Sequence, residues 1–277
     1  MQKTKYIVDN RWLSRQLDDP SVAIVDCRFQ LTKPYWGEEE YHKTHIKGAH
    51  YLDLNRDLSG QVQRHGGRHP LPDIEIFSRK MTELGIVKNK TFVVAYDNFR
   101  FAFAARLWWL LRYLGHDKVA LLNGGWNSWV ADGYPVSREI PKAKTGSFIP
   151  QPHFDWLVDI ETTKAARKDN SIVIIDSRDS DRYLGIREPI DPIPGSIDSA
   201  VNSPWKQVTN NFGYLQSLAK QQNLWEQYRS ASEIIVYCGS GVTACVNLFS
   251  LEIAGLHNAK LYVGGWSDWC SYSNETC

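Results

Sequence analysis

The chain has 277 residues, enough for one large α/β domain or two domains of medium size. Its charges nearly cancel, with 32 Lys and Arg against 31 Asp and Glu, which predicts neither a nucleic-acid partner nor membrane binding. Five widely spaced cysteines without a Cys-x-x-Cys pair argue against a disulfide framework and a zinc site. We expect a cytoplasmic protein without a metal or cofactor, and its N-terminus is too polar for a signal peptide.

Segments of the first half recur, in the same order, in the second half. The predicted strand VAIVDCR (22–28) matches SIVIIDSR (171–178), and THIKGAHYLDL corresponds more loosely to GSIDSAVNSPW. Predicted strands at 91–96 and 233–238 are each followed by a helical pattern, which ends near Gly115 and near Gly255. VALLNGGWNSW then matches AKLYVGGWSDW. Three or more matches in one order indicate a duplicated domain.

The two copies predict two domains, 1–137 and 153–277, because the segment 138–152 is rich in proline and has little periodicity. Within each copy, short apolar strands alternate with helices, which predicts a parallel sheet flanked by helices. In such folds, ligand sites lie at the carboxyl ends of the strands. Cys238 stands at one of these ends, whereas Asp97 takes the aligned position of the first copy. We therefore expect a catalytic second domain and a non-catalytic first one.

Cys238 opens the loop CGSGVTA, which joins the predicted strand to a helix starting near Val242. Glycines let this loop turn tightly, and N–H groups converge at a helix start, where they favour the reactive thiolate. Three other interpretations of Cys238 compete with a role as a nucleophile. The first is a buried cysteine with only a structural role. A dinucleotide loop would need more chain than the 36 residues after Gly241, and a phosphatase would need a guanidinium where Ala244 stands.

These features resemble the two-domain rhodanese family of sulfurtransferases, and the likeness covers nearly the whole chain. The tandem copies, DSR after the first strand of the second copy, CGSGVTA and the repeated GGW carry it. CGSGVTA is similar to the loop of the 3-mercaptopyruvate sulfurtransferases. Thiosulfate-preferring members usually carry basic residues where Gly239 and Ser240 stand. GRHPLPD (67–73) and LWWLLRYLGH (107–116) also resemble bacterial members.

The resemblance implies a ping-pong transfer, in which the Cys238 thiolate takes sulfur from 3-mercaptopyruvate and carries it as a persulfide. Arg182 is the family-matched clamp for the donor's carboxylate, and Arg187 is a second candidate at a spacing that departs from the family. The Ser240 hydroxyl is expected to donate a hydrogen bond to the carbonyl or to the sulfur of the sulfur donor. The loop residues expected to stabilise the sulfur anion through their backbone amides are Gly239, Gly241, Val242 and Thr243.

Proton transfer is expected to involve His69, which matches a family histidine. Asn55 stands where the family often has an aspartate, so a Ser–His–Asp relay would need Asp53 or Asp57 instead. Cys270 and Cys277 have no assigned role.

Several alternatives stay open at this stage. The sulfur acceptor could be thioredoxin, glutathione or cyanide. A thiosulfate:cyanide sulfurtransferase on the same scaffold and a non-catalytic sulfur-binding module are the two competing functions.

Overall fold

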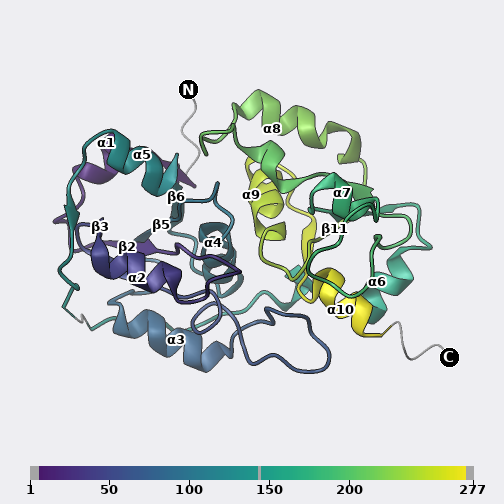
Figure 1. Ribbon diagram of the computed structural model, residues 1–277, viewed down its shortest axis with the longest axis horizontal. Coiled ribbons are helices and arrows are strands. Elements are labelled where there is room, and N and C mark those ends of the chain that lie inside the picture. Colours follow the sequence, from purple (N-terminus) through teal and green to yellow (C-terminus); the bar gives the residue numbers. More distant parts are fainter. Residues whose placement is uncertain (1–5, 143–144, 273–277) are drawn as a thin grey trace. The chain divides into compact units, whose positions relative to one another are not determined.

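The computed structural model of the protein describes residues 6–142 and 145–272 (Figure 1). It divides into two compact units, and each unit takes in one short segment from the other half of the sequence. The first unit holds the chain up to Gly60, Pro72–His153 and Asn211–Leu215. The second unit holds Gln61–Leu71, Phe154–Asn210 and the chain from Gln216 onward. The predicted domain boundaries at 137 and 153 stay a prediction.

The first unit is built on a parallel five-stranded sheet with the order β1-β6-β5-β2-β4. Its strands are β1 (Ile7–Val8), β2 (Val22–Asp26), β4 (Ala49–Tyr51), β5 (Phe92–Tyr96) and β6 (Val119–Leu122). Its helices are α1 (Asn10–Ser14), α2 (Trp36–Lys43), α3 (Ile74–Glu83), α4 (Ala104–Tyr113) and α5 (Gly125–Ala131). A short antiparallel pair, β3 (His45–Ile46) and β7 (Val136–Ser137), completes it.

The second unit repeats this sheet strand for strand, with the order β8-β12-β11-β9-β10 and all pairs parallel. Its strands are β8 (Leu157–Val158), β9 (Ile172–Asp176), β10 (Val201–Asn202), β11 (Glu233–Tyr237) and β12 (Ala259–Tyr262). Its helices are α6 (Ile160–Ala166), α7 (Ser180–Tyr183), α8 (Leu218–Trp225), α9 (Ala244–Ala254) and α10 (Gly265–Ser271). Three 3-10 turns are η1 (Phe154–Trp156), η2 (Trp205–Val208) and η3 (Glu226–Tyr228).

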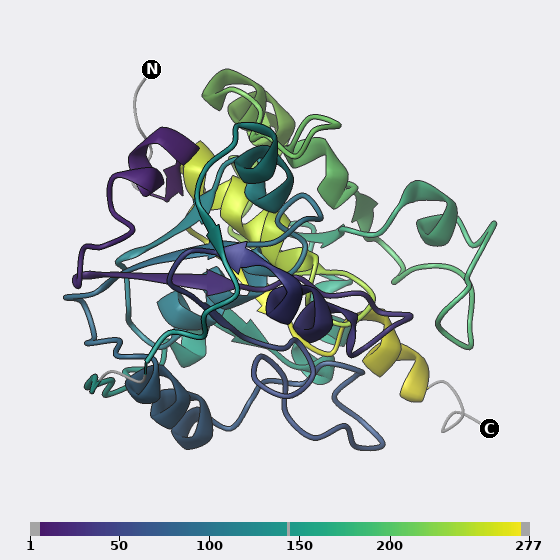
Figure 2. The same ribbon diagram turned by 60° about the vertical axis from the view of Figure 1, so that its left-hand side comes forward.

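Each sheet is covered by helices, as the alternation of strands and helices predicts. In the first unit, Leu13 of α1 and Trp129 of α5 pack on the sheet face formed by Ile24 and Val94. In the second unit, α6 and α10 supply the corresponding core, and α9 packs beside α8 (Figure 1, Figure 2). None of the described helices has both the length and the apolar character needed to cross a bilayer.

Buried charge pairs mark the same place in both units. Arg28 donates to both carboxylate oxygens of Asp26, at 2.7 to 3.1 Å, and Arg178 does the same to Asp176 at 2.6 to 3.1 Å. All four side chains are almost fully buried, with relative exposures of 0 to 1%. Such pairs persist only where the geometry and further hydrogen bonds compensate for the lost hydration. The matching segments of the two halves therefore fold into matching structures.

Candidate active site

Cys238 lies directly after strand β11 and just before helix α9, with only 2% of its surface exposed. Its carbonyl accepts a hydrogen bond of 2.8 Å from the backbone N–H of Trp266, in the second GGW segment. Asp97 of the first unit accepts the same bond from Trp126, at 2.9 Å. The repeated GGW motif therefore fixes the residue that follows the central strand in each unit.

The loop after Cys238 leads into the helix start. Gly241 has a φ of +72°, a left-handed conformation that residues with a side chain adopt at a cost. Helix α9 begins at Ala244, two residues later than the pattern predicts, with Thr243 as its N-cap residue. Among the described residues, no atom accepts a hydrogen bond from the backbone N–H of Val242 or Thr243. These donors belong to the positive end of the helix and are available to an anion.

Asp97 shows how this fold collects N–H groups around a negative charge. Its carboxylate accepts hydrogen bonds of 2.8 to 3.1 Å from the backbone N–H groups of Phe99, Phe101, Phe103 and Ala104. Burial still raises the pKa of the Asp97 carboxyl, although these four donors oppose the shift. The first unit therefore fills its own anion cradle with a carboxylate.

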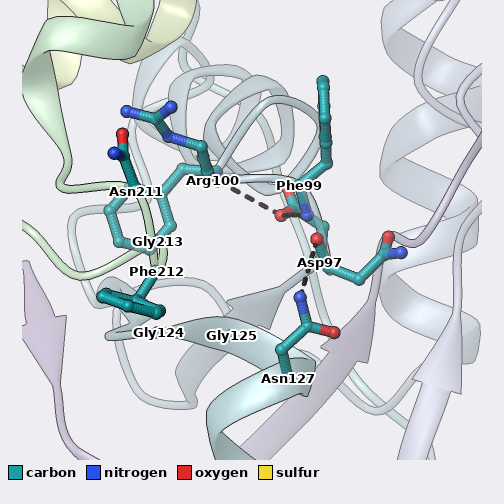
Figure 3. Close-up of a pocket in the computed structure, with 11 residues that line it drawn as sticks. Asp97, Phe99, Arg100, Gly124, Gly125, Asn127, Asn211, Phe212 and Gly213 are labelled. Atoms are coloured by element: carbon teal, nitrogen blue, oxygen red, sulfur yellow. Dashed lines mark hydrogen bonds between the residues drawn. The ribbon is translucent and has the colours of Figure 1, made fainter.

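A pocket of about 290 Å³ adjoins this carboxylate in the first unit. Figure 3 shows Asp97 beside Phe99 and Arg100, with Phe212 and Gly213 on the far side. The segment that carries the last two residues comes from the second half of the sequence but belongs to this unit.

The segment 61–71 is fixed to the second unit by its own backbone. The N–H of Gly66 donates to the Asp268 carboxylate at 2.6 Å, and the N–H of Arg68 donates to the Ser267 hydroxyl at 3.2 Å. A side chain on Gly67 would lie 2.3 Å from the carbonyl oxygen of Gly264, so only glycine fits there. These contacts place Arg68 and His69 beside the loop of Cys238.

His69 and Ser240 form a buried pair. Nδ1 of His69 lies 2.7 Å from the Ser240 hydroxyl, and the two residues are 6% and 7% exposed. Asp53, the predicted third member of a relay, belongs to the first unit, where its carboxylate accepts from the N–H groups of Asn55 and Arg56. Asp57 also belongs to that unit and accepts from the N–H of Asp53. The structure therefore brings together the predicted histidine and serine within one unit.

Arg182 lies against the loop of Cys238. A side-chain carbon at Gly239 would lie 3.5 Å from Nη1 and from Nη2 of Arg182, and 3.0 Å from Nη2 of Arg68. The two guanidinium groups thus lie within contact distance of the place where a side chain at position 239 would begin. Arg187 is placed differently: its side chain is 59% exposed and pairs with Asp181 at 2.7 Å.

Two buried acids hold these arginines, and the sequence analysis did not single them out. Glu188 accepts from Nε and Nη2 of Arg182 at 3.0 and 2.8 Å. Asp191 accepts from Nη2 of Arg182 at 2.9 Å and, through its other oxygen, from Nη1 of Arg68. The acid side chains are only 1 to 2% exposed. Arg68 was also missed, although it stands next to the predicted His69 in GRHPLPD.

The remaining cysteines offer little to this site. Cys27, Cys245 and Cys270 are buried and not in disulfides, and burial raises the pKa of Cys27 and of Cys270. Cys277 lies outside the described residues. Within residues 6–142 and 145–272, no three His, Cys, Asp or Glu side chains are grouped so as to hold a metal ion.

Comparison with known proteins identifies the family. Residues 9–132 and 159–272 match the rhodanese-like domain. The chain belongs to the rhodanese family. The "Probable 3-mercaptopyruvate sulfurtransferase" of Pseudomonas aeruginosa is 39% identical over 93% of this chain and 92% of that protein. The 3-mercaptopyruvate sulfurtransferase of Escherichia coli K12 is 33% identical over 96% and 95% of the two chains.

A solved structure has the same fold, and a further relative is similar in sequence. The crystal structure of the E. coli 3-mercaptopyruvate sulfurtransferase SseA has a TM-score of 0.83 and is 31% identical, covering 95% of this chain and all of that one. A "Putative thiosulfate sulfurtransferase SseB" of Mycobacterium tuberculosis is 31% identical over 92% and 90% of the chains. The predicted family and the predicted fold of two tandem rhodanese-like domains are confirmed.

Proposed function

We propose that this rhodanese-family protein is a sulfurtransferase that takes sulfur from 3-mercaptopyruvate and passes it to a thiol through a persulfide on Cys238. One arrangement carries the proposal: Cys238 opens a loop that ends in helix N–H donors, and two guanidinium groups lie against the same loop at Gly239. The N–H donors suit a sulfur anion, and the guanidinium groups suit the carboxylate of the donor. The names of the relatives from P. aeruginosa and E. coli support this donor.

The first half-reaction is a nucleophilic displacement at sulfur. The Cys238 thiolate forms a bond to the donor sulfur, and the carbon–sulfur bond breaks with its electron pair moving to carbon. Pyruvate leaves as its enolate, which then takes up a proton. The transferred sulfur keeps the proton of the donor thiol, and the persulfide becomes an anion when it releases this proton to solvent. The loop donors can then stabilise the loaded enzyme as they stabilise the thiolate of the starting enzyme.

His69 and Ser240 are suited to deliver the proton. The Ser240 hydroxyl lies beside the nucleophile in sequence and 2.7 Å from Nδ1 of His69, so a proton lost from the hydroxyl to the enolate is replaced by the imidazolium. We expect Ser240→Ala and His69→Asn each to lower kcat for 3-mercaptopyruvate by about 10²-fold. Steady-state pyruvate release measures this effect. Unchanged kcat in both variants would remove the pair from the proton path.

Arg182 is expected to bind the carboxylate of the donor. Charged hydrogen bonds contribute about 1.5–3 kcal/mol, so Arg182→Ala should raise KM for 3-mercaptopyruvate by about 10- to 100-fold with a smaller loss of kcat. An unchanged KM would exclude Arg182 from the clamp. Arg187→Ala tests the second predicted contact in the same assay: a raised KM would support it, and an unchanged KM would exclude it.

The two units are proposed to have different roles. The domain at 153–277 carries out catalysis, and the domain at 1–137 is a scaffold, because Asp97 fills the position of the nucleophile there. We place the protein in the cytoplasm, where thioredoxin and glutathione supply reduced acceptor thiols. Cyanide would serve as an alternative acceptor in an assay.

Donor kinetics separate the remaining functions. We expect kcat/KM for 3-mercaptopyruvate to exceed that for thiosulfate, because the loop has Gly239 and Ser240 where thiosulfate-preferring members usually carry basic residues. A clear preference for thiosulfate would make the protein a thiosulfate sulfurtransferase. No turnover of either donor by folded protein would favour a non-catalytic sulfur-binding module.

A further inference from the structure

The acid partners of the two arginines beside Cys238 accept hydrogen bonds from only some of the guanidinium nitrogens. Arg68 donates to Asp191 through Nη1, and Arg182 donates to Glu188 and Asp191 through Nε and Nη2. In the part of the chain that the structure describes, no residue accepts from Nη2 of Arg68 or from Nη1 of Arg182. One nitrogen of each guanidinium is therefore left for another anion.

Both remaining nitrogens lie close to the same position. They lie 3.0 Å and 3.5 Å from the position of a side-chain carbon at Gly239, the residue directly after the nucleophile. Burial lowers the pKa of Arg68, whereas the charge of a Cys238 thiolate raises it, so the two groups are close enough to interact. Both nitrogens thus lie beside the residue that follows the nucleophile.

Asp191 explains how two like charges stay side by side. Its two carboxylate oxygens contact one guanidinium each, and its side chain is only 1% exposed. The N–H of Asp191 in turn donates to Glu188 at 3.0 Å, which fixes the backbone of the bridge. Asp191 therefore bridges the two arginines, while Glu188 also fixes the orientation of Arg182.

We propose that Arg68 is the second half of the donor clamp, and that Asp191 positions it so that Arg68 and Arg182 bind one carboxylate together. This inference rests on the proposed function, since the carboxylate is that of 3-mercaptopyruvate. In this proposal Arg68 takes the role of the second clamp for which Arg187 was a candidate; Arg187 lies in an exposed ion pair. A carboxylate has two oxygens, and one nitrogen from each arginine matches them.

A pair of donors tests the clamp. Mercaptoacetone has the thiol and the ketone of mercaptopyruvate but no carboxylate. We expect Arg68→Ala to raise KM for 3-mercaptopyruvate by about 10- to 100-fold, as for Arg182→Ala, while kcat/KM for mercaptoacetone changes less than about threefold. Arg64→Ala, from the exposed part of the same segment, is the matched control and should leave both donors unaffected.

A double variant of Arg68 and Arg182 and substitutions of Asp191 give two further tests of the clamp. If both arginines hold one carboxylate, Arg68→Ala with Arg182→Ala should raise KM by much less than the product of the single effects. Asp191→Asn keeps the shape but loses the charge, so it should raise KM for mercaptopyruvate with kcat retained, and Asp191→Glu should restore part of the loss. Arg68→Lys keeps the charge without the fork and should give an intermediate KM.

The kinetics of Arg68→Ala can contradict the proposed clamp in two ways. Equal losses for mercaptopyruvate and mercaptoacetone in Arg68→Ala would show that Arg68 acts on the thiol of Cys238 or on the fold, and would overturn the clamp. An unchanged KM for mercaptopyruvate would overturn it as well. Mass spectrometry of the wild-type protein distinguishes this from failure of the proposed function: a protein that gains sulfur on Cys238 retains the function even where the clamp is refuted.

Discussion

Replacing Cys238 with serine is expected to abolish sulfur transfer from 3-mercaptopyruvate, with kcat/KM falling by roughly 10³-fold or more. Serine keeps the size of the side chain, but its hydroxyl is a weak nucleophile and cannot hold a persulfide. The backbone that surrounds residue 238 should not change, because the bonds to Trp266 and Ser267 are made by main-chain atoms of the loop. Pyruvate release with a thiol acceptor measures the loss.

Two buried cysteines provide controls for this result. Cys245→Ser and Cys270→Ser remove thiols from helices α9 and α10, and we expect both variants to keep the wild-type kcat/KM within about threefold when they fold. Circular dichroism and the melting temperature show whether each variant is folded. Retained activity in folded Cys238→Ser, or its loss in folded Cys270→Ser with Cys238 intact, would contradict the assignment of the nucleophile.

Arg178→Met is expected to cause a large loss of stability. It leaves Asp176 buried without its partner and removes the contacts of Arg178 with Glu188 at 3.2 Å and with the Gly195 carbonyl at 2.6 Å. Breaking a buried ion pair from one side costs about 3–5 kcal/mol, which corresponds to a fall of about 10 °C in Tm for a protein of this size. Because Glu188 also holds Arg182, we expect KM for the donor to rise in the protein that remains folded.

The first unit offers the matched variant. Arg28 makes the same pair with Asp26 and donates to the Thr44 carbonyl at 2.7 Å, but no acid of the donor clamp depends on it. Arg28→Met should therefore lower the free energy of unfolding by a similar amount and leave KM unchanged. Thermal unfolding and donor kinetics on both variants test this. If Arg178→Met keeps the wild-type Tm, the buried pair does not stabilise the second unit.

The duplicated architecture could be predicted because it depends on local patterns. The strand and the Asp-x-Arg segment at 22–28 recur almost unchanged at 171–178. In each copy the Asp carboxylate accepts a hydrogen bond from the backbone N–H of the Arg two residues later, so the pair is a local feature. Cys238 could be predicted for the same reason, since a strand, a glycine loop and a helix are consecutive in the sequence. The aligned Asp97 also pointed to the unit without a nucleophile.

The rest of the site depends on contacts between distant segments. Nothing local in GRHPLPD shows that Arg68 and His69 belong to the second unit, because their anchors Asp268 and Ser267 lie some two hundred positions along the chain. The acids Glu188 and Asp191 stand in a proline-containing loop without periodicity, so no local pattern predicts that their side chains are buried. The structure shows them buried in ion pairs with Arg182. Arg187 stays a prediction: the resemblance made it a second candidate clamp at a spacing that departs from the family, and the structure places it in an exposed pair with Asp181.

The central claim is that Cys238 itself carries the sulfur, and single-turnover mass spectrometry tests it most directly. The protein is mixed with 3-mercaptopyruvate without an acceptor, and the tryptic peptide 230–260, which contains both Cys238 and Cys245, is fragmented to locate any added sulfur. We predict one pyruvate released per chain and one sulfur atom on Cys238, discharged on addition of a thiol. Folded protein that releases no pyruvate, or that gains sulfur only at another cysteine, would contradict the account.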